Sequence, residues 1–299
     1  MRMKLRAYAK INPGLDVTGV RENGYHEVRM IMQTVDLYDE IILEKAEGRE
    51  IRCQNSRDDL PEDGGNLAVR AAELLIKEFD IPSGVKIRLN KNIPVAAGMA
   101  GGSSDAAAVL AGMNHLFGLN LTEGELSRIA VRIGADVPYC LSGGTVLAEG
   151  IGEVLTLLPD LPDCPILIAK PAVSVSTEYV YRNLSCDQVA HPDIDGMLQA
   201  VRKGDLPGIV KRLGNVLESV SIPAFPVIRE IKDTMKEYGA EGVLMSGSGP
   251  SVFGIFPDRA AAEHAADVLL HGRTDLELVS VTQPVKRSTV MKYHTGEIV

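Results

Sequence analysis

The chain has 299 residues, of which 45% are hydrophobic, 24% charged and 4% aromatic. That balance is typical of a folded globular protein and excludes disordered, collagen-like and disulfide-stapled chains. With 31 basic and 40 acidic residues the net charge is −9, which argues against a nucleic-acid partner.

Strand patterns dominate the first ninety residues. Apolar and polar residues alternate over residues 4–11, which predicts a half-buried strand that ends at Asn12-Pro13-Gly14 and carries Lys10 at its polar end. Further strands are predicted at residues 28–35, 40–45 and 85–90. Before the last of these, Asn66 is a suitable N-cap for a helix with apolar residues at three- and four-residue spacing.

Two more helices are predicted in the next fifty residues. The first should begin at Asp105, where a run of helix formers follows two serines able to cap it. The second should begin at Thr122, because Thr122 and Glu125 have the spacing of a capping box. This helix is expected to end at Gly134, so that Asp136 follows a helix end directly.

Pro159, Pro162 and Pro165 interrupt the strand-like runs that follow, and we expect a boundary there between domains of residues 1–158 and 159–299. In the second half, strands are predicted at residues 166–170, 242–245, 252–256 and 276–281, and helices at residues 194–202, 206–217, 227–238 and 259–270. The mixture lacks a regular alternation of strand and helix. It therefore favours an α+β architecture over one doubly wound sheet.

The chain shows no sign of a membrane or disulfide-dependent protein. No stretch reaches the roughly 18 uninterrupted apolar residues of a membrane span, and no apolar signal-peptide core follows the basic N-terminus. The four cysteines contain no C-x-x-C pair, so we expect reduced packing residues rather than a zinc or redox motif. These features predict a cytoplasmic protein with no membrane partner, and they leave the oligomeric state open.

The strongest chemical signal is the glycine-rich segment of residues 94–104. Small residues let a backbone approach a ligand closely, and the free N–H groups of the following helix start favour a phosphate. A plain turn would need only one or two glycines. A Walker A loop is excluded because the chain has no Gly-Lys pair, and a dinucleotide fingerprint fails because Ala100 and Ser103 replace its second and third glycines.

Four stretches together resemble the GHMP kinase superfamily, which is named for galactokinase, homoserine kinase, mevalonate kinase and phosphomevalonate kinase. They are the glycine-rich segment; Ala9-Lys10-Ile11-Asn12 with Arg21-Glu-Asn-Gly-Tyr25-His26-Glu27; Gly134-Ala-Asp136-Val-Pro138; and Leu244-Met-Ser-Gly247-Ser248-Gly-Pro250. The resemblance covers most of the chain, and Ala100 stands where the family usually has glycine. It implies a ribosomal-protein-like N-terminal α/β domain facing a ferredoxin-like C-terminal α+β domain, with the active site in the cleft.

The resemblance is strongest to the branch that phosphorylates the 2-hydroxyl of a cytidine diphosphate methylerythritol, and it implies ATP and Mg²⁺ as cofactors. Asp136 would be the base that faces the acceptor hydroxyl, and Lys10 would stabilise the carboxylate and the developing negative charge. The implied ATP-binding residues are Pro94, Val95, Ala96, Ala97, Gly98, Met99, Ala100, Gly101, Gly102, Ser103 and Ser104. The implied substrate-binding residues are Asn12, Tyr25, His26, Tyr181, Gly247 and Ser248.

Among the substrate-binding residues, Tyr25 would stack on the cytosine ring and His26 would bind its edge, which requires the two neighbours to lie on a turn. Tyr181 would cover the opposite face of the ring, and core packing is an equal alternative. Gly247-Ser248-Gly249-Pro250 would close on the substrate or be only a turn. The other histidines, His115, His191, His264, His271 and His294, are predicted to lie at the surface.

Several alternatives remain at this point. A lone Asp136 could cap the turn before Pro138, and a lone Lys10 could be a solvated charge. Ser103 and Ser104 could cap the helix, bind phosphate or bind Mg²⁺, and no protein ligand of the metal is identified. A homoserine or mevalonate kinase would share the loop but has no use for the cytidine-directed pair. An RNA-binding module would require a basic stripe, which the charge balance does not supply.

Overall fold

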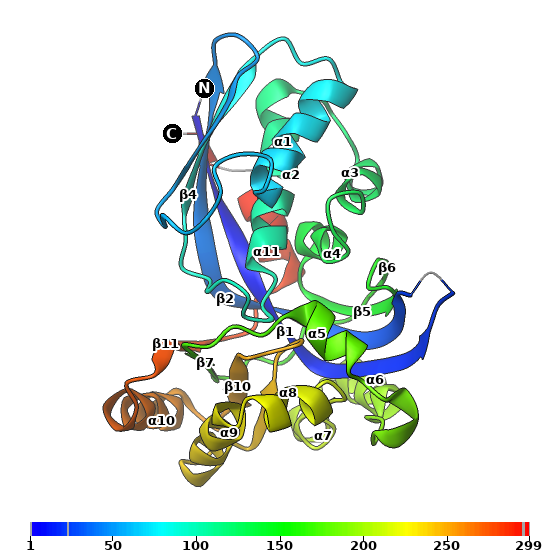
Figure 1. The fold of residues 1–299 in the computed structure, drawn as a ribbon, viewed down its shortest axis with the longest axis vertical. Coiled ribbons are helices and arrows are strands. Elements are labelled where there is room, and N and C mark those ends of the chain that lie inside the picture. Colours follow the sequence, from blue (N-terminus) through cyan, green and yellow to red (C-terminus); the bar gives the residue numbers. More distant parts are fainter. Residues whose placement is uncertain (1, 23, 295–296, 299) are drawn as a thin grey trace.

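The computed structural model of the chain describes residues 2–22, 24–294 and 297–298 (Figure 1). Its strands are β1 (Arg2–Val20), β2 (His26–Ala46), β3 (Ile51–Asn55), β4 (Gly84–Asn90), β5 (Thr145–Gly150), β6 (Val154–Leu157), β7 (Ile166–Pro171), β8 (Gly214–Asn215), β9 (Gly242–Met245), β10 (Val252–Ile255), β11 (Leu276–Thr282) and β12 (Glu297–Ile298). Its helices are α1 (Leu67–Glu78), α2 (Gly101–Phe117), α3 (Glu123–Ala130), α4 (Val137–Ser142), α5 (Thr177–Arg182), α6 (Ile194–Lys203), α7 (Leu206–Val210), α8 (Glu218–Ala224), α9 (Val227–Glu237), α10 (Arg259–Gly272) and α11 (Arg287–His294), with a 3-10 helix at Cys186–Gln188.

Within the described residues the strands form two sheets. The larger has the order β12-β1-β2-β4-β3, with β5 and β6 continuing from β2 and β8 lying beside β1; the smaller has the order β11-β7-β10-β9. In Figure 1 helices α1, α2, α3, α4 and α11 gather beside the larger sheet, and α8, α9 and α10 lie below the smaller one. This is the expected α+β architecture. The division at residues 158 and 159 stays a prediction.

Helix α2 is the central element of the larger half, because its alanine-rich sequence lets it pack directly on the sheet. Gly112 marks the closest approach: a Cβ there would lie 2.6 Å from Leu43 and 2.9 Å from Leu5. The helix is buried from Ser104 to Leu116 on its inner faces. Close packing along this length fixes where its N-terminal end, which follows the glycine-rich segment, meets solvent.

Two strands are longer than the sequence pattern predicts. Strand β1 does not end at Asn12-Pro13-Gly14, because register shifts beside Lys10 and between Ile11 and Gly14 accommodate the proline. Strand β2 is continuous where two separate strands were predicted. Their antiparallel pairing forms the longest ladder of the molecule and carries Lys10 in its middle.

Helix ends were predicted with mixed success. The Asn66 cap of α1 and the capping box of Thr122 and Glu125 are confirmed by their hydrogen bonds. The prediction that α2 begins at Asp105 is wrong: it begins at Gly101, and Ala100 is its N-cap. The helix predicted for residues 206–217 ends at Val210, and β8 and α8 follow.

The helices and strands that the sequence did not predict are short or lie next to a predicted element. They include β3, α4, α5, α8 and α11. Helix α11 packs against β1 and α4, where His294 is buried. The prediction that every remaining histidine lies at the surface is therefore wrong for His294.

Candidate active site

A cavity of about 990 Å³ collects the residues that the sequence singled out. Its wall contains Lys10 from β1, the glycine-rich segment before α2, Asp136 before α4, and Tyr181 from α5. Gly247 and Ser248, between β9 and β10, complete it. Every predicted site residue lines this cavity except Met99 and Ser104. Positions far apart in sequence thus meet in one place.

Lys10 is buried, and its ammonium is held by two hydrogen bonds. Nζ donates to Asn12 Oδ1 at 2.7 Å and to the carbonyl oxygen of Gly98 at 2.9 Å. Burial lowers the pKa of Lys10, while the negative charge of Asp136 acts in the opposite direction. Since a lysine has three N–H donors, one remains for a ligand in the cavity.

Asp136 lies at the cavity wall, and its carboxylate forms no hydrogen bond or ion pair with the residues that the structure describes. It does not follow a helix end directly, as predicted, but is the N-cap residue of α4, and its side chain makes no capping hydrogen bond. Its charge acts on Lys10 and also contributes, after burial, to the raised pKa of Tyr181. A half-buried carboxylate therefore faces both the ammonium and the aromatic end of the cavity.

The glycine-rich segment presents backbone donors to the cavity. The first N–H groups of α2, at Gly101, Gly102 and Ser103, have no partner within the helix, and the helix dipole adds positive potential there. Ala100 adopts left-handed angles, with φ 58° and ψ 27°. The N-cap that joins this segment to α2 is therefore an alanine in a conformation that favours glycine.

The second glycine-rich loop packs directly on the first. Ser246 Oγ donates to the carbonyl oxygen of Gly98 at 3.0 Å, the same oxygen that accepts from Lys10. A Cβ on Gly98 would lie 2.1 Å from the Ser246 carbonyl oxygen, and one on Gly247 would lie 3.3 Å from Lys10 Nζ. Only glycine permits this approach. The loop is thus more than a connection between β9 and β10.

Met99 and Ser104 lie behind the cavity wall. Met99 is buried, and its carbonyl oxygen accepts from the Lys10 backbone N–H at 3.2 Å. Ser104 Oγ donates to the Tyr8 carbonyl oxygen at 2.6 Å, because by this position α2 has turned toward the sheet. The two serines therefore differ: Ser103 lines the cavity, and Ser104 fastens the helix to β1.

Aromatic residues line a further part of the cavity wall, called here the aromatic end. Tyr25 precedes β2, and His26 is its first residue, so the pair lies where a loop passes into a strand. The rings of His26 and Tyr181 are 4.9 Å apart, whereas Tyr25 is 59% exposed. Next to them, Ser248 Oγ and Thr177 Oγ1 form a 2.9 Å hydrogen bond that joins α5 to the second glycine-rich loop.

Sequence reasoning missed several residues of the wall. Asn66 was identified only as a helix cap and Asp105 only as a helix start, and Lys91 and Thr177 were not singled out, yet all four line the cavity. A lysine three residues before Pro94 and an aspartate in the first turns of α2 were the available signals. Neither residue type is unusual in such a position, so the pattern alone did not distinguish them.

The cavity suits a metal ion that arrives with its ligand. Among the described residues no cluster of three or more His, Cys, Asp or Glu side chains could hold a metal by itself. The Asp136 carboxylate and the Ser103 hydroxyl are oxygen donors in the wall. This set fits Mg²⁺, which keeps several waters and needs only one or two protein oxygens beside phosphates.

The described part of the chain contains no helix that is both long and apolar enough to cross a membrane.

Two family models match the sequence: GHMP kinases N terminal domain over residues 66–144, and GHMP kinases C terminal over residues 197–271. The first matched region contains the glycine-rich segment and Asp136. The second contains the loop of Gly247 and Ser248.

Individual relatives agree with the family models. The chain is 57% identical to a protein of Lachnospira eligens named 4-diphosphocytidyl-2-C-methyl-D-erythritol kinase, over 86% of this chain and 89% of that protein. A crystal structure of 4-(cytidine 5'-diphospho)-2C-methyl-D-erythritol kinase superposes with a TM-score of 0.81 at 34% identity, covering 94% of this chain and 99% of that chain. Homoserine kinase from Cytophaga hutchinsonii has a TM-score of 0.77 at 22% identity, covering 95% of each chain, and shares the fold.

Proposed function

The chain belongs to the GHMP kinases, in the branch of the 4-diphosphocytidyl-2-C-methyl-D-erythritol kinases, and from this premise we propose the reaction and the residues that perform it. The chain transfers the terminal phosphoryl group of ATP to the 2-hydroxyl of 4-diphosphocytidyl-2-C-methyl-D-erythritol, a step of the non-mevalonate route to isoprenoid precursors. The observation that carries the assignment of roles is the meeting of Lys10, Asp136 and the phosphate loop, residues 94–103, at one cavity.

The phosphate loop binds the polyphosphate of ATP. Its backbone donors and the dipole of α2 supply positive potential without a side-chain charge. Lys10 extends this field to the transferred group through its remaining N–H donor. The Ser103 hydroxyl and the Asp136 carboxylate would hold Mg²⁺ beside the phosphates, where the ion would neutralise phosphate charge.

Asp136 accepts the proton of the acceptor hydroxyl. Phosphoryl transfer proceeds through a loose transition state, so the proton can leave late and a carboxylate of modest basicity suffices. The nearby Lys10 ammonium stabilises the carboxylate and the charge that develops during transfer. The alternatives considered for each residue alone do not describe them, because the Asp136 side chain makes no capping hydrogen bond and Lys10 is buried.

The aromatic end of the cavity holds the cytidine group of the acceptor. His26 and Tyr181 are already in contact there, and Tyr25 lies beside them. Asn12 contacts Lys10, Gly247 packs on Gly98 of the phosphate loop, and Ser248 contacts Thr177 of α5, so these residues are suited to bind the methylerythritol diphosphate. A homoserine or mevalonate acceptor has no group that would use the aromatic end.

A coupled assay with three acceptors tests this proposal. The purified chain should phosphorylate the cytidine diphosphate methylerythritol and leave homoserine and mevalonate unchanged. Asp136→Asn should reduce kcat by about 100-fold or more, as expected for a lost general base, while ATP binding measured by calorimetry persists. The variant Asp160→Asn, outside the cavity wall, is the matched control. Turnover of Asp136→Asn close to that of the unchanged chain would refute the assigned base.

A further inference from the structure

A second cavity lies among helices α2, α3, α4 and α11, which pack on one another beside the larger sheet (Figure 1). Its volume is about 350 Å³, at the lower end of the range for small-molecule sites. None of its described wall residues lines the active-site cavity, and the proposed reaction gives it no role. The apolar part of its wall consists of Ala111, Leu121, Leu126, Leu141 and Met291.

Helix α11 forms one wall of this cavity and is fastened at both of its ends. At its first residue, the Arg287 guanidinium donates to both carboxylate oxygens of Glu123, from the start of α3, at 2.8 and 2.6 Å. At its last residue, the imidazole of His294 donates to the backbone carbonyl oxygen of Leu141, from α4. Met291, between these anchors, lines the cavity. The two anchors thus hold α11 beside a hollow that its own side chains do not fill.

Most polar groups of the wall are already engaged. The Asn114 side chain donates to the carbonyl oxygen of Leu121 at 3.0 Å and accepts from its N–H at 2.9 Å. Glu123 is neutralised by its ion pair with α11. His294 is only 5% exposed, and its bond to α4 is the only hydrogen bond that its ring makes to a described residue. One ring nitrogen of His294 is therefore left for a ligand in the cavity.

The state of the His294 ring defines the chemistry of that ligand. Burial lowers the pKa of His294 to about 4, so the ring is neutral at neutral pH. A neutral imidazole has one donor nitrogen and one acceptor nitrogen, and the donor is used by Leu141, so the remaining nitrogen accepts. A ligand must supply a donor to it and fill the apolar remainder of the cavity without a charge, because an unpaired buried charge is unfavourable. These conditions select a compact uncharged molecule with one O–H or N–H group.

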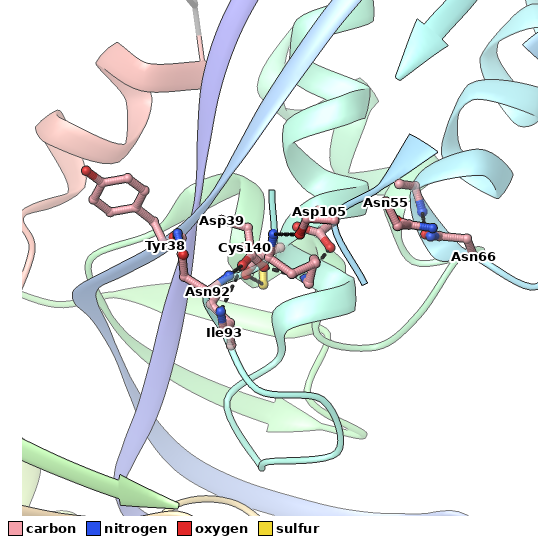
Figure 2. Close-up of polar contacts among 12 residues, drawn as sticks. Tyr38, Asp39, Asn55, Asn66, Asn92, Ile93, Asp105 and Cys140 are labelled. Carbon is pink, nitrogen blue, oxygen red and sulfur yellow. Dashed lines mark hydrogen bonds and ion pairs between the residues drawn. The ribbon is translucent and has the colours of Figure 1, made fainter. Parts of the chain in front are cut away.

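The cavity touches the far ends of two helices that form the active site. Helix α2 begins at the phosphate loop and lines the second cavity from Ala111 onward. Helix α4 begins after Asp136 and reaches the second cavity at Leu141. The two helices are also joined to each other, because Ser104 Oγ and Cys140 Sγ form a 3.2 Å hydrogen bond (Figure 2). A molecule in the second cavity would thus contact both of these helices.

We propose that this cavity is an effector site for a compact, uncharged, apolar molecule with one hydrogen-bond donor, which binds through His294. Such a molecule stabilises the arrangement that it binds, and in this arrangement Asp136 faces Lys10. Occupancy of the cavity should therefore raise kcat. The effect on kcat rests on the proposed role of Asp136, whereas binding itself does not.

Indole and 1-methylindole test the site, because they share an apolar body and only indole has an N–H donor. Affinities are measured by ligand-observed NMR titration. Indole should bind about fivefold more tightly than 1-methylindole, the effect of one hydrogen bond. In His294→Phe, which keeps a ring and loses the acceptor, the two should bind alike. In protein with labelled histidine, indole should shift the His294 ring signal, which is identified by its loss in His294→Phe.

A second variant fills the cavity. Ala111→Leu should weaken binding of both ligands by about tenfold or more, because the larger side chain occupies their space. Ala261→Leu, the same change at a half-buried position of α10, is the matched control. Cytidine diphosphate should not displace indole, since it binds in the other cavity. Equal affinities for the two ligands, unchanged binding in Ala111→Leu, or displacement by cytidine diphosphate would overturn the site.

The activity assay then tests the effector role. Saturating indole should raise kcat of the unchanged chain and of Ala261→Leu by about twofold or more, through a shift toward the productive arrangement, and should have no such effect on Ala111→Leu. A fall in kcat, or a constant kcat at full occupancy, would overturn the role. If the chain did not phosphorylate the cytidine substrate, the proposed function would fail, and the NMR titration would still decide whether the site exists.

Discussion

The imidazole ring of His26 and the phenol ring of Tyr181 are in contact, with centroids 4.9 Å apart and ring planes inclined at 53°. His26 begins β2, and Tyr181 lies in α5, so this contact joins the two halves of the chain at the cavity. A tilted pair at this separation is a favourable aromatic geometry. A cytosine ring that enters here meets a preformed aromatic wall.

Removal of the Tyr181 ring should weaken binding of the acceptor and leave the binding of ATP unchanged. Base stacking contributes about 1–3 kcal/mol, so Tyr181→Ala should raise KM for the cytidine substrate by about 5- to 150-fold. Tyr179→Ala is the matched control, because Tyr179 lies on the same helix, is 47% exposed and does not line the cavity. Steady-state kinetics with each substrate varied in turn checks this. A rise confined to KM for ATP would contradict the assignment.

The approach of the two glycine-rich loops predicts a strong effect of a single methyl group. In Gly98→Ala the new Cβ would lie 2.1 Å from the Ser246 carbonyl oxygen, so the loops must separate and the bond from Lys10 to residue 98 is disturbed. Gly118 has a similar φ of 64° with no atom within 4 Å, so Gly118→Ala carries only the backbone strain, about 1 kcal/mol. We expect Gly98→Ala to lose at least tenfold in kcat/KM and Gly118→Ala to keep it. Similar activities of the two variants would rule out the close approach as the cause.

Ala100 offers a test in the opposite direction. Its left-handed angles cost an alanine about 1–2 kcal/mol, and glycine costs about 0.5–1 kcal/mol in chain entropy. Ala100→Gly should therefore raise the free energy of unfolding by about 0.5–1 kcal/mol, measured by urea denaturation. Ala111→Gly, in the interior of the same helix, should lower it by about 1 kcal/mol. A loss of stability in Ala100→Gly would show that the strain is absent.

His294 predicts a dependence of stability on pH. Burial lowers the pKa of His294 from 6.5 to about 4 in the folded chain. Between these values the unfolded chain binds more protons, so the free energy of unfolding should fall as pH decreases from 6.5 toward 4, by at most about 1.4 kcal/mol per pH unit from this group. In His294→Gln this slope should be smaller, measured by urea denaturation at several pH values. His271→Gln, at an exposed position, should keep the full slope.

The sequence predicted the elements whose signals are local. Asn66 and the pair Thr122 and Glu125 marked helix starts correctly, because a capping side chain bonds to its own helix within three residues. The start of α2 was misplaced because Gly101 and Gly102 are poor helix formers, although the first turn needs no internal N–H bonds and tolerates them. Packing against the sheet decided that boundary.

Only some of the residues at the cavity were predicted. Lys10 and Asp136 were found through the family pattern, and the structure places both at the same cavity. Lys91 contacts the carboxylates of Asp39 and Asp105 but had no such signal, since these residues lie 52 and 14 positions away and each alone reads as a surface charge. Only the fold brings these three side chains together, so no periodicity or spacing could reveal them.

The Gly98 carbonyl oxygen accepts from Lys10, which lies 88 positions earlier in the sequence, and from Ser246, which lies 148 positions later. During synthesis on the ribosome Lys10 is therefore added to the chain long before Ser246, which donates to the same carbonyl oxygen. A nascent chain that stops short of the second glycine-rich loop lacks one wall of the cavity. Catalytic competence should consequently emerge late in translation, after most of the polypeptide has left the exit tunnel.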